Sequence, residues 1–136
     1  MINLKERKNK ELTKNIGVNQ RLHNNLILNK DVTFKIAIQH KLDNDFDFKS
    51  LKREGLKEFQ AFIYSIFKEN MTISQVEKLF LRTKGEVFKN VTIKDEFVKE
   101  IHLGKNVSKF RLFGYFNQDN YFVITKIDPN HDFHKD

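Results

Sequence analysis

The sequence contains no cysteine and no tryptophan, and it has a single proline among its 136 residues. Without cysteine the chain forms no disulfide and offers no thiolate ligand to a metal, so its stability has to come from packing. The first residues, Met1 to Lys5, turn charged at once, and no later stretch approaches about twenty consecutive apolar residues. We therefore expect a cytoplasmic protein without a signal peptide and without a membrane partner.

Aromatic residues are abundant by contrast, with fourteen phenylalanines and three tyrosines. Packing between such rings supplies much of the energy of a core. A chain of this length suits one ordinary domain, which buries roughly two-thirds of the surface that its unfolded form exposes. We predict a single folded domain over residues 31–136.

Positive charge is concentrated at the start of the chain. The formal net charge is +7, and residues 1–30 hold seven Lys and Arg against two Glu. Clustered cations favour polyanionic partners because they displace counterions from a phosphate backbone, although simple solubility explains the same charge. We interpret residues 1–30 as a basic N-terminal arm or a short helix.

Apolar spacing predicts a strand and then a helix. Residues 32–39 alternate between apolar and other side chains, which is the period of a half-buried strand. Asp47 or Ser50 is placed to cap a following helix. Between Leu51 and Glu69 apolar residues recur at three- and four-residue steps, so we expect an amphipathic helix whose apolar face, Leu56 included, lies in the core.

A second helix is predicted from its cap. Thr72 and Gln75 have the spacing of a capping box. We expect Leu79 to face the core, and Lys84 with Gly85 to supply a cationic last turn and a C-terminal cap. Residues 86–104 fit either a strand or a short helix.

The end of the chain predicts a β-hairpin. Residues 107–116 and 121–128 are rich in β-branched and aromatic side chains, and the loop between them, Asn117 to Asn120, has hairpin length. Pro129 has no amide hydrogen to give to a ladder and should end the second strand. Together these elements predict an α+β fold, with a small antiparallel sheet packed against two helices.

The hairpin also contains a pair of cations. If Phe116 opposes Tyr121, then Arg111 opposes Lys126, with Lys109 on the same face. Like charges directly opposite one another destabilise a sheet unless an anion or solvent lies between them. A phosphate site is the functional interpretation, and two solvated side chains that diverge are the alternative.

The tail and the hairpin add His131, His134, Tyr115 and Tyr121. A neutral imidazole can exchange a proton near neutral pH, and RNA cleavage needs no metal because the 2′-hydroxyl is itself the nucleophile. Exposed tail residues or adventitious metal ligands are the alternatives for the histidines. The tyrosines are placed either to stack on bases or to pack in the core.

Three other histidines, His23, His40 and His102, have no partner at motif spacing, so the sequence assigns them no role. There is no Walker phosphate loop, dinucleotide fingerprint, paired-histidine zinc helix or nucleophile elbow. We therefore expect no metal and no cofactor, and neither nucleotide hydrolysis, redox chemistry nor serine-type hydrolysis.

The order of one strand, two helices and a C-terminal hairpin in a small basic chain resembles the RelE/ParE-like toxin superfamily. The similar part runs from Lys109 to Tyr115, then through residues 121–128 to His131. The ending Asp128-Pro129-Asn130-His131 is also similar to uncharacterised bacterial and mobile-element proteins that close in such a hairpin. The long N-terminal segment and residues 86–104 depart from the pattern of the toxins.

The resemblance implies helices on one face of a small antiparallel sheet. It implies cleavage of messenger RNA on the ribosome by basic and histidine or tyrosine side chains, and an antitoxin protein as partner. The leading hypothesis is a metal-independent endoribonuclease toxin in which Arg111 and Lys126 hold the phosphate. In it His131 or His134 acts as acid or base, Lys109 adds charge, and Tyr115 and Tyr121 contact RNA.

Two other functions fit the same sequence. The first is a non-catalytic phage or mobile-element inhibitor whose basic N-terminal segment binds nucleic acid or an acidic protein surface. The second is a ParE-like inhibitor of a protein target, which shares the fold and needs no histidine.

Overall fold

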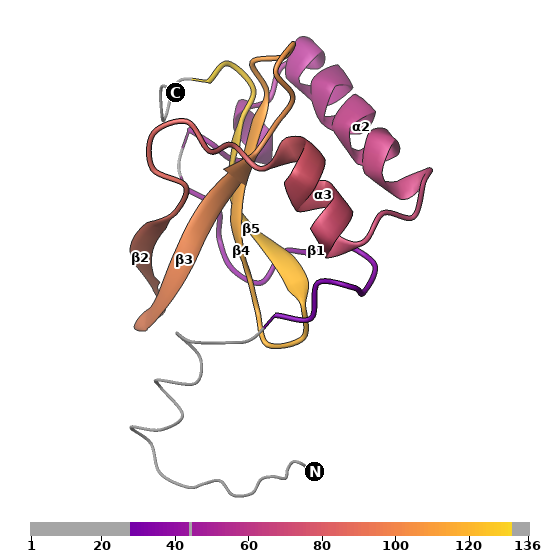
Figure 1. The fold of residues 1–136 in the computed structure, drawn as a ribbon. Coiled ribbons are helices and arrows are strands. Elements are labelled where there is room, and N and C mark those ends of the chain that lie inside the picture. Colours follow the sequence, from indigo (N-terminus) through magenta and orange to yellow (C-terminus); the bar gives the residue numbers. More distant parts are fainter. Residues whose placement is uncertain (1–27, 44, 132–136) are drawn as a thin grey trace, which may run out of the picture.

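The fold is taken from a computed structural model that describes residues 28–43 and 45–131. The five strands form one sheet in the order β1-β5-β4-β3-β2, so β2 to β5 make a meander and β1 joins its far edge (Figure 1). In chain order the elements are β1 (Lys35–Ala37), the short 3-10 helix η1 (Phe48–Ser50), α2 (Arg53–Phe67), α3 (Ile73–Phe80), β2 (Lys89–Ile93), β3 (Glu96–Leu103), β4 (Arg111–Phe116) and β5 (Tyr121–Asp128).

The sheet is mixed, with one parallel pair. β1 runs parallel to β5, whereas the three other pairs are antiparallel. The α+β class is therefore confirmed, and the sheet is mostly antiparallel as expected, with the β1–β5 pair as a parallel exception. No hairpin joins β1 to β5, because the chain leaves β1 for the helices and enters the sheet again at the opposite edge. The turn geometry that forces an antiparallel direction is absent from this pair.

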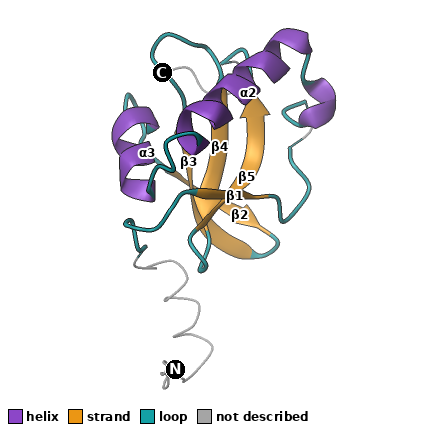
Figure 2. Cartoon of the chain, turned by 90° about the vertical axis from the view of Figure 1, so that its right-hand side faces the viewer, coloured by secondary structure: helices purple, strands orange, loops and turns teal. Residues whose placement is uncertain are grey.

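Both helices lie on one face of the sheet, where the main core forms (Figure 2). Rings dominate this core: Phe122 of β5 packs against Phe34 and Phe116 with centroid distances of 5.7 and 5.3 Å. Phe62 of α2 packs against Phe80 of α3 at 5.1 Å. The aromatic content of the sequence is thus used mainly to join the helices to the sheet.

α2 confirms the predicted first helix. Its Phe59, Phe62 and Ile66 are buried in the core and Ile63 and Phe67 pack against it, while Leu56 is 55% exposed. The inclusion of Leu56 in the core is therefore wrong, because the side of the helix in contact with the core is narrower than the apolar pattern. Among the described residues, no helix is both long and apolar enough to cross a bilayer.

α3 begins where the sequence predicts. Thr72 accepts from the amide of Gln75 at 3.2 Å, and the Gln75 side chain accepts from the amide of Thr72 at 2.8 Å. The predicted end is wrong, because the helix stops at Phe80 and not at Lys84 and Gly85.

Pairing with the sheet ends α3 early. The amide of Gly104 donates to the carbonyl of Phe80 at 2.9 Å, and the amide of Arg82 donates to the carbonyl of His102 at 3.0 Å. These bonds draw the chain out of the helix and along the end of β3. Leu79, expected in the core, is 56% exposed on the outer side of α3.

The sequence of residues 86–104 fits either a strand or a short helix. In the structure this segment contains the hairpin of β2 and β3. Its turn is Lys94-Asp95, and both residues have positive φ, 49° and 67°. Two successive residues of this kind form the turn that matches the twist of a hairpin, and Asp is one of the residues that tolerate it.

The C-terminal hairpin is confirmed as β4 and β5, and β5 ends at Asp128, directly before Pro129. Its predicted register is wrong. Arg111 stands opposite Asp128, and Lys126 stands opposite Phe113. The two cations therefore do not face one another across the strands, and no like-charge repulsion has to be relieved between them.

Two local features shift the register. Phe116 pairs with Phe122, because the amide of Asn117 bonds to the carbonyl of Tyr121 and makes the loop one residue longer than we expected. A bulge at Thr125 then adds a second residue to β5. Each feature moves the partner of Arg111 by one residue, so the two together change it from Lys126 to Asp128.

Candidate active site

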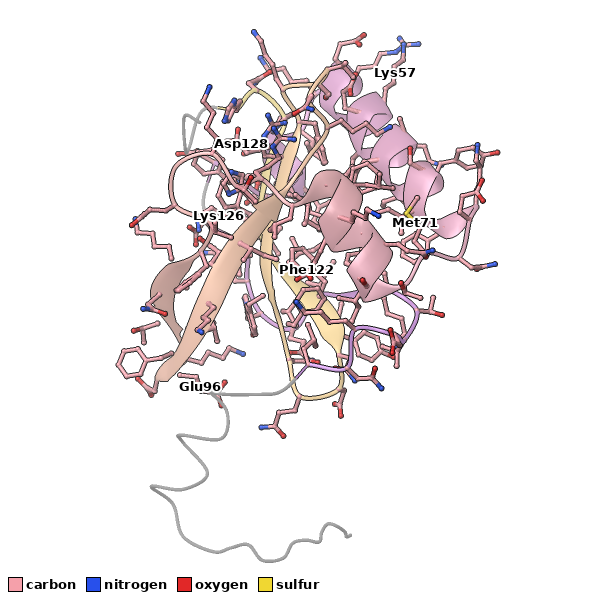
Figure 3. All side chains as sticks on the ribbon, viewed as in Figure 1. Lys57, Met71, Glu96, Phe122, Lys126 and Asp128 are labelled. Atoms are coloured by element: carbon pink, nitrogen blue, oxygen red, sulfur yellow. The ribbon has the colours of Figure 1, made fainter. Side chains whose placement is uncertain are left out.

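The two faces of the sheet carry different side chains, because successive residues of a strand point to opposite sides. One face supplies the apolar core under the helices. Figure 3 shows Phe122 on that side, with Lys126 and Asp128 on the other. We call this other side the polar face, defined by Glu100 and His102 of β3, Arg111, Phe113 and Tyr115 of β4, and Thr125, Lys126 and Asp128 of β5, all of them buried.

Two segments cover the polar face. Residues 38–43 and 45–46 follow the edge of β5, where the amide of Asp43 donates to the carbonyl of Thr125 and the amide of Ile127 donates to the carbonyl of Phe46. Residues 86–89 approach from the side of β2 and β3. The polar face is thus covered by non-helical segments of the chain rather than by helices.

The bulge in β5 brings two neighbouring side chains to one carboxylate. The hydroxyl of Thr125 donates to Oε2 of Glu100 at 2.5 Å, and Nζ of Lys126 lies 2.7 Å from the same oxygen. In a regular strand these consecutive residues would point to opposite faces. The extra residue turns both towards β3, so the register shift and the position of Glu100 have one cause.

Lys126 forms the centre of this arrangement. Its ammonium also lies 3.3 Å from Oδ2 of Asp43 and 5.5 Å from the centroid of the Phe113 ring. Lys126 is 5% exposed and Glu100 is 4% exposed. A buried ion pair contributes little net stability, because the loss of hydration offsets the attraction, so stability alone does not explain the presence of this pair.

A cavity of about 100 Å³ opens beside the ion pair. Glu100 and His102 are two positions apart in β3, so they share a face with their Cα atoms roughly 7 Å apart. The His102 ring stacks on Phe113 with a centroid distance of 4.8 Å. The residues that line the cavity are Glu86, Val87, Phe88, Lys89, Glu100, His102 and Phe113.

One oxygen of Glu100 is available to a ligand. Both of its hydrogen bonds end on Oε2, and Oε1 receives none from the part of the chain that the structure describes. Lys89 stands directly opposite Glu100 in the pairing of β2 with β3, and its side chain is exposed. The cavity therefore combines a buried carboxylate oxygen, an imidazole and a solvated cation.

Arg111, a predicted phosphate ligand, holds the backbone of the turn before β4. Its Nη1 donates to the carbonyls of Lys105, Ser108 and Phe110 at 3.3, 2.7 and 2.8 Å. The side chain lies over Gly104, where an added Cβ would come within 2.6 Å of Nη1. We interpret Arg111 as a structural residue of this turn.

The two predicted RNA-contacting tyrosines lie in different surroundings. Tyr115 is buried on the polar face and stacks on His40, with their rings 3° from parallel and 5.9 Å apart. Burial raises the pKa of the Tyr115 hydroxyl above its ordinary value of 10.0, and the negative charge of Glu96 adds to the shift. Tyr121 is half-buried at the hairpin loop, with the Lys35 ammonium 5.1 Å from its ring centroid.

Lys109 and His131, two other predicted site residues, do not line the cavity. Lys109 is exposed and precedes β4, so it is not part of the sheet. His131 follows β5 with a φ of 58° and does not line the cavity. His134 lies outside the described residues, as does most of the predicted N-terminal arm. Of the predicted set, the structure brings Arg111, Tyr115 and Lys126 together on the polar face.

The sequence interpretation missed Glu100, His102 and Lys89. The available signal was the alternation of Val98, Glu100 and His102, which is the period of a strand with one buried face. Two titratable residues in that pattern are typical of a solvated face, and residues 86–104 had no assigned element. Only the pairing of β3 with β4 shows that these positions are enclosed.

Within residues 28–43 and 45–131, no group of three or more His, Asp or Glu side chains is arranged to hold a metal ion. Comparisons of the chain with protein-family models, with curated proteins and with solved structures each find no match.

Proposed function

We propose that the chain is a metal-independent endoribonuclease toxin of the RelE-like class, with its active site in the cavity of the polar face. The observation that carries the proposal is Glu100, a buried carboxylate that lines a cavity together with His102 and keeps one oxygen without a hydrogen bond from the described chain. A base, an acid and a nearby cation are the groups that cleavage at a ribose 2′-hydroxyl requires.

The reaction proceeds by transfer within the RNA chain. Oε1 of Glu100 takes the proton of the 2′-hydroxyl, whose oxygen attacks the neighbouring phosphorus atom. The new bond joins O2′ to phosphorus, and the bond from phosphorus to O5′ breaks. His102, as an imidazolium, gives its proton to O5′. The products are a 2′,3′-cyclic phosphate and a 5′-hydroxyl end.

Lys89 and Lys126 have different roles in this proposal. Lys89 is exposed beside Glu100 and stabilises the negative charge that develops on the phosphate. Lys126 is buried against Oε2 of Glu100 and, with Thr125, fixes the direction of the carboxylate. The net charge of +7 favours the approach of RNA.

The proposal keeps the toxin class that the resemblance implies and changes its residues. Proton transfer moves from His131 or His134 to Glu100 and His102, and phosphate binding moves from Arg111 to Lys89. Lys126 stays in the site as a positioning residue. An antitoxin protein that covered the polar face would close the cavity and keep the toxin inactive.

Induced expression in a bacterial host tests the proposal, with total RNA sequenced for new 5′-hydroxyl ends within minutes. We expect cleavage by the wild type and a loss of at least about 100-fold in His102→Gln and in Glu100→Gln. Glu69→Gln is the matched control, because Glu69 is exposed and lies just after the end of α2. A thermal melt of each purified variant separates loss of chemistry from loss of fold.

Glu100→Gln removes the negative charge closest to the buried Lys126 ammonium and lowers stability, so His102→Gln carries the test if the first variant does not fold. Absence of new ends with the wild type contradicts the proposal. Unchanged cleavage in a folded His102→Gln contradicts the assigned site. Toxicity without any loss of RNA would favour the ParE-like inhibition of a protein target.

The second candidate is a non-catalytic protein that binds nucleic acid or an acidic protein surface. The observation in its favour is the charge of residues 1–30, which hold seven Lys and Arg against two Glu. Deletion of residues 1–30 would abolish binding in this case, and His102→Gln would have no effect. An enzyme built on the polar face keeps part of its cleavage after the same deletion.

A further inference from the structure

Three of the residues that line the cavity have no role in the proposed reaction. Glu86, Val87 and Phe88 line it from the segment just before β2, and all three are exposed. Phe88 is 44% exposed, and the Lys99 ammonium lies 4.9 Å from its ring centroid. An exposed ring next to an exposed carboxylate at the rim of a cavity has no evident packing role.

We propose that these residues form a nucleobase subsite that selects guanine at the cleaved nucleotide. The inference rests on the proposed function, because it places the base of the same nucleotide whose 2′-hydroxyl meets Glu100. Single-stranded RNA is recognised in this way, by stacking of an unpaired base on an aromatic ring and hydrogen bonds to its Watson–Crick edge.

The carboxylate of Glu86 determines which base fits. Within the described residues it takes part in no hydrogen bond or ion pair. A carboxylate only accepts, and its two oxygens suit two adjacent donors. Among the RNA bases guanine alone has two adjacent donors on its Watson–Crick edge, the ring N1–H and the N2 amino group. Adenine and cytosine each place an acceptor next to their amino group, which a carboxylate repels.

The positions of the residues suit one nucleotide. Lys89 is opposite Glu100 across the two strands and immediately follows Phe88, so the rim lies one residue from the proposed chemistry. The Lys99 ammonium lies over the Phe88 ring, and the base would stack on the side of the ring away from it. The ribose then spans from Phe88 to Glu100, with its 2′-hydroxyl near Oε1.

Replacement of Glu86 by glutamine gives the sharpest test. The carboxamide of Glu86→Gln has one acceptor and one donor, so it can no longer accept from both N1–H and the N2 amino group of guanine, and it can pair instead with the amino group and N1 of adenine. We expect the wild type to cut after guanine, and the variant to lose about tenfold in rate there and to gain cleavage after adenine. Phe88→Leu should weaken binding of either base. Glu69→Gln and Phe97→Leu, on the exposed side of the β2–β3 hairpin, are the controls.

The measurement is the base at each new 3′ end, read with the purified full chain on a randomised RNA. Cleavage without a guanine preference, or a preference unchanged in Glu86→Gln, overturns the subsite and leaves the ribonuclease proposal standing.

A binding measurement separates the two proposals. Backbone amide shifts of residues 86–89 and 100–102 are followed by NMR while guanosine or adenosine 5′-monophosphate is added. Shifts with the guanine nucleotide that Glu86→Gln transfers to the adenine nucleotide support the subsite, even if the chain cleaves no RNA. Equal shifts with both nucleotides, or none at millimolar concentration, overturn it.

Discussion

The two faces of the sheet differ in what they bury. Under the helices the sheet buries hydrocarbon and rings, with Phe122 and Ile124 on β5 and Leu112 on β4. On the polar face the same strands bury two carboxylates, two cations and an imidazole. The first face needs only shape complementarity to be stable, whereas each charged group on the second face requires a partner of its own.

This difference separates residues that hold the fold from residues that are available for chemistry. Burial of apolar side chains explains the core residues of the helix-covered face. The polar face gains little from its ion pair and keeps an acceptor oxygen of Glu100 at a cavity. Groups that are buried at a cost and placed at an opening are candidates for function.

The largest loss of stability is expected from a substitution on the helix-covered face. Phe122→Ala removes a fully buried ring that packs against Phe34 and Phe116, and should lower the free energy of unfolding by about 3–5 kcal/mol. Urea denaturation measures it, with exposed Phe97→Ala as the control at well below 1 kcal/mol. A loss below about 1 kcal/mol for Phe122→Ala would show that this face does not dominate stability.

A smaller loss is expected when the ion pair of the polar face is broken. Lys126→Met leaves Glu100 buried without its ammonium partner and should cost about 3 kcal/mol. Adding Glu100→Leu removes the stranded charge, so the double variant should regain most of that loss. If denaturation finds that the two losses simply add, the pair is not coupled as the distances indicate.

The capping box lies on the helix side and should have a moderate effect. Thr72→Ala removes the hydroxyl that accepts from the amide of Gln75, and should lower stability by about 1 kcal/mol. Thr72→Ser keeps the hydroxyl and is the matched control. An equal loss in both variants would assign the effect to packing of the methyl group rather than to the cap.

The smallest effect on stability is expected on the polar face, at alkaline pH. The pKa of Tyr115 is raised by burial and by Glu96, so the folded state keeps its proton after the unfolded chain has begun to lose it at pH 10.0. The contribution is fully present below that pH and is lost as the pH rises towards the folded pKa. Tyr115→Phe should flatten the fall in thermal stability above pH 10, and an equally steep fall in the variant would contradict this cause.

Elements with a strong local signal could be predicted from the sequence. The capping box at Thr72 and the aromatic hairpin, expected over residues 107–128, depend on neighbours in the chain; the cap is found as expected, and the hairpin strands are found at residues 111–116 and 121–128. The extent of a helix was harder to predict, since α3 stops at Phe80 only because the next residues pair with β3.

The candidate site could not be predicted in the same way. Its geometry depends on one additional loop residue at the hairpin and on the bulge at Thr125, and neither has a clear sequence signal. Together they separate Arg111 from Lys126 and direct Lys126 to Glu100. Glu100 and His102 have the pattern of a solvated face, and only the tertiary pairing of β3 reveals their burial.

Cleavage of a defined RNA by the purified chain in excess EDTA tests the central claim most directly. Each substrate is prepared with ribose and with 2′-deoxyribose at the cut position. We predict a 2′,3′-cyclic phosphate product from the ribose substrate only, with activity lost in folded His102→Gln and kept in Glu69→Gln. Cleavage of the deoxy substrate, or full activity in His102→Gln, would contradict the assignment of the polar face as a ribonuclease site.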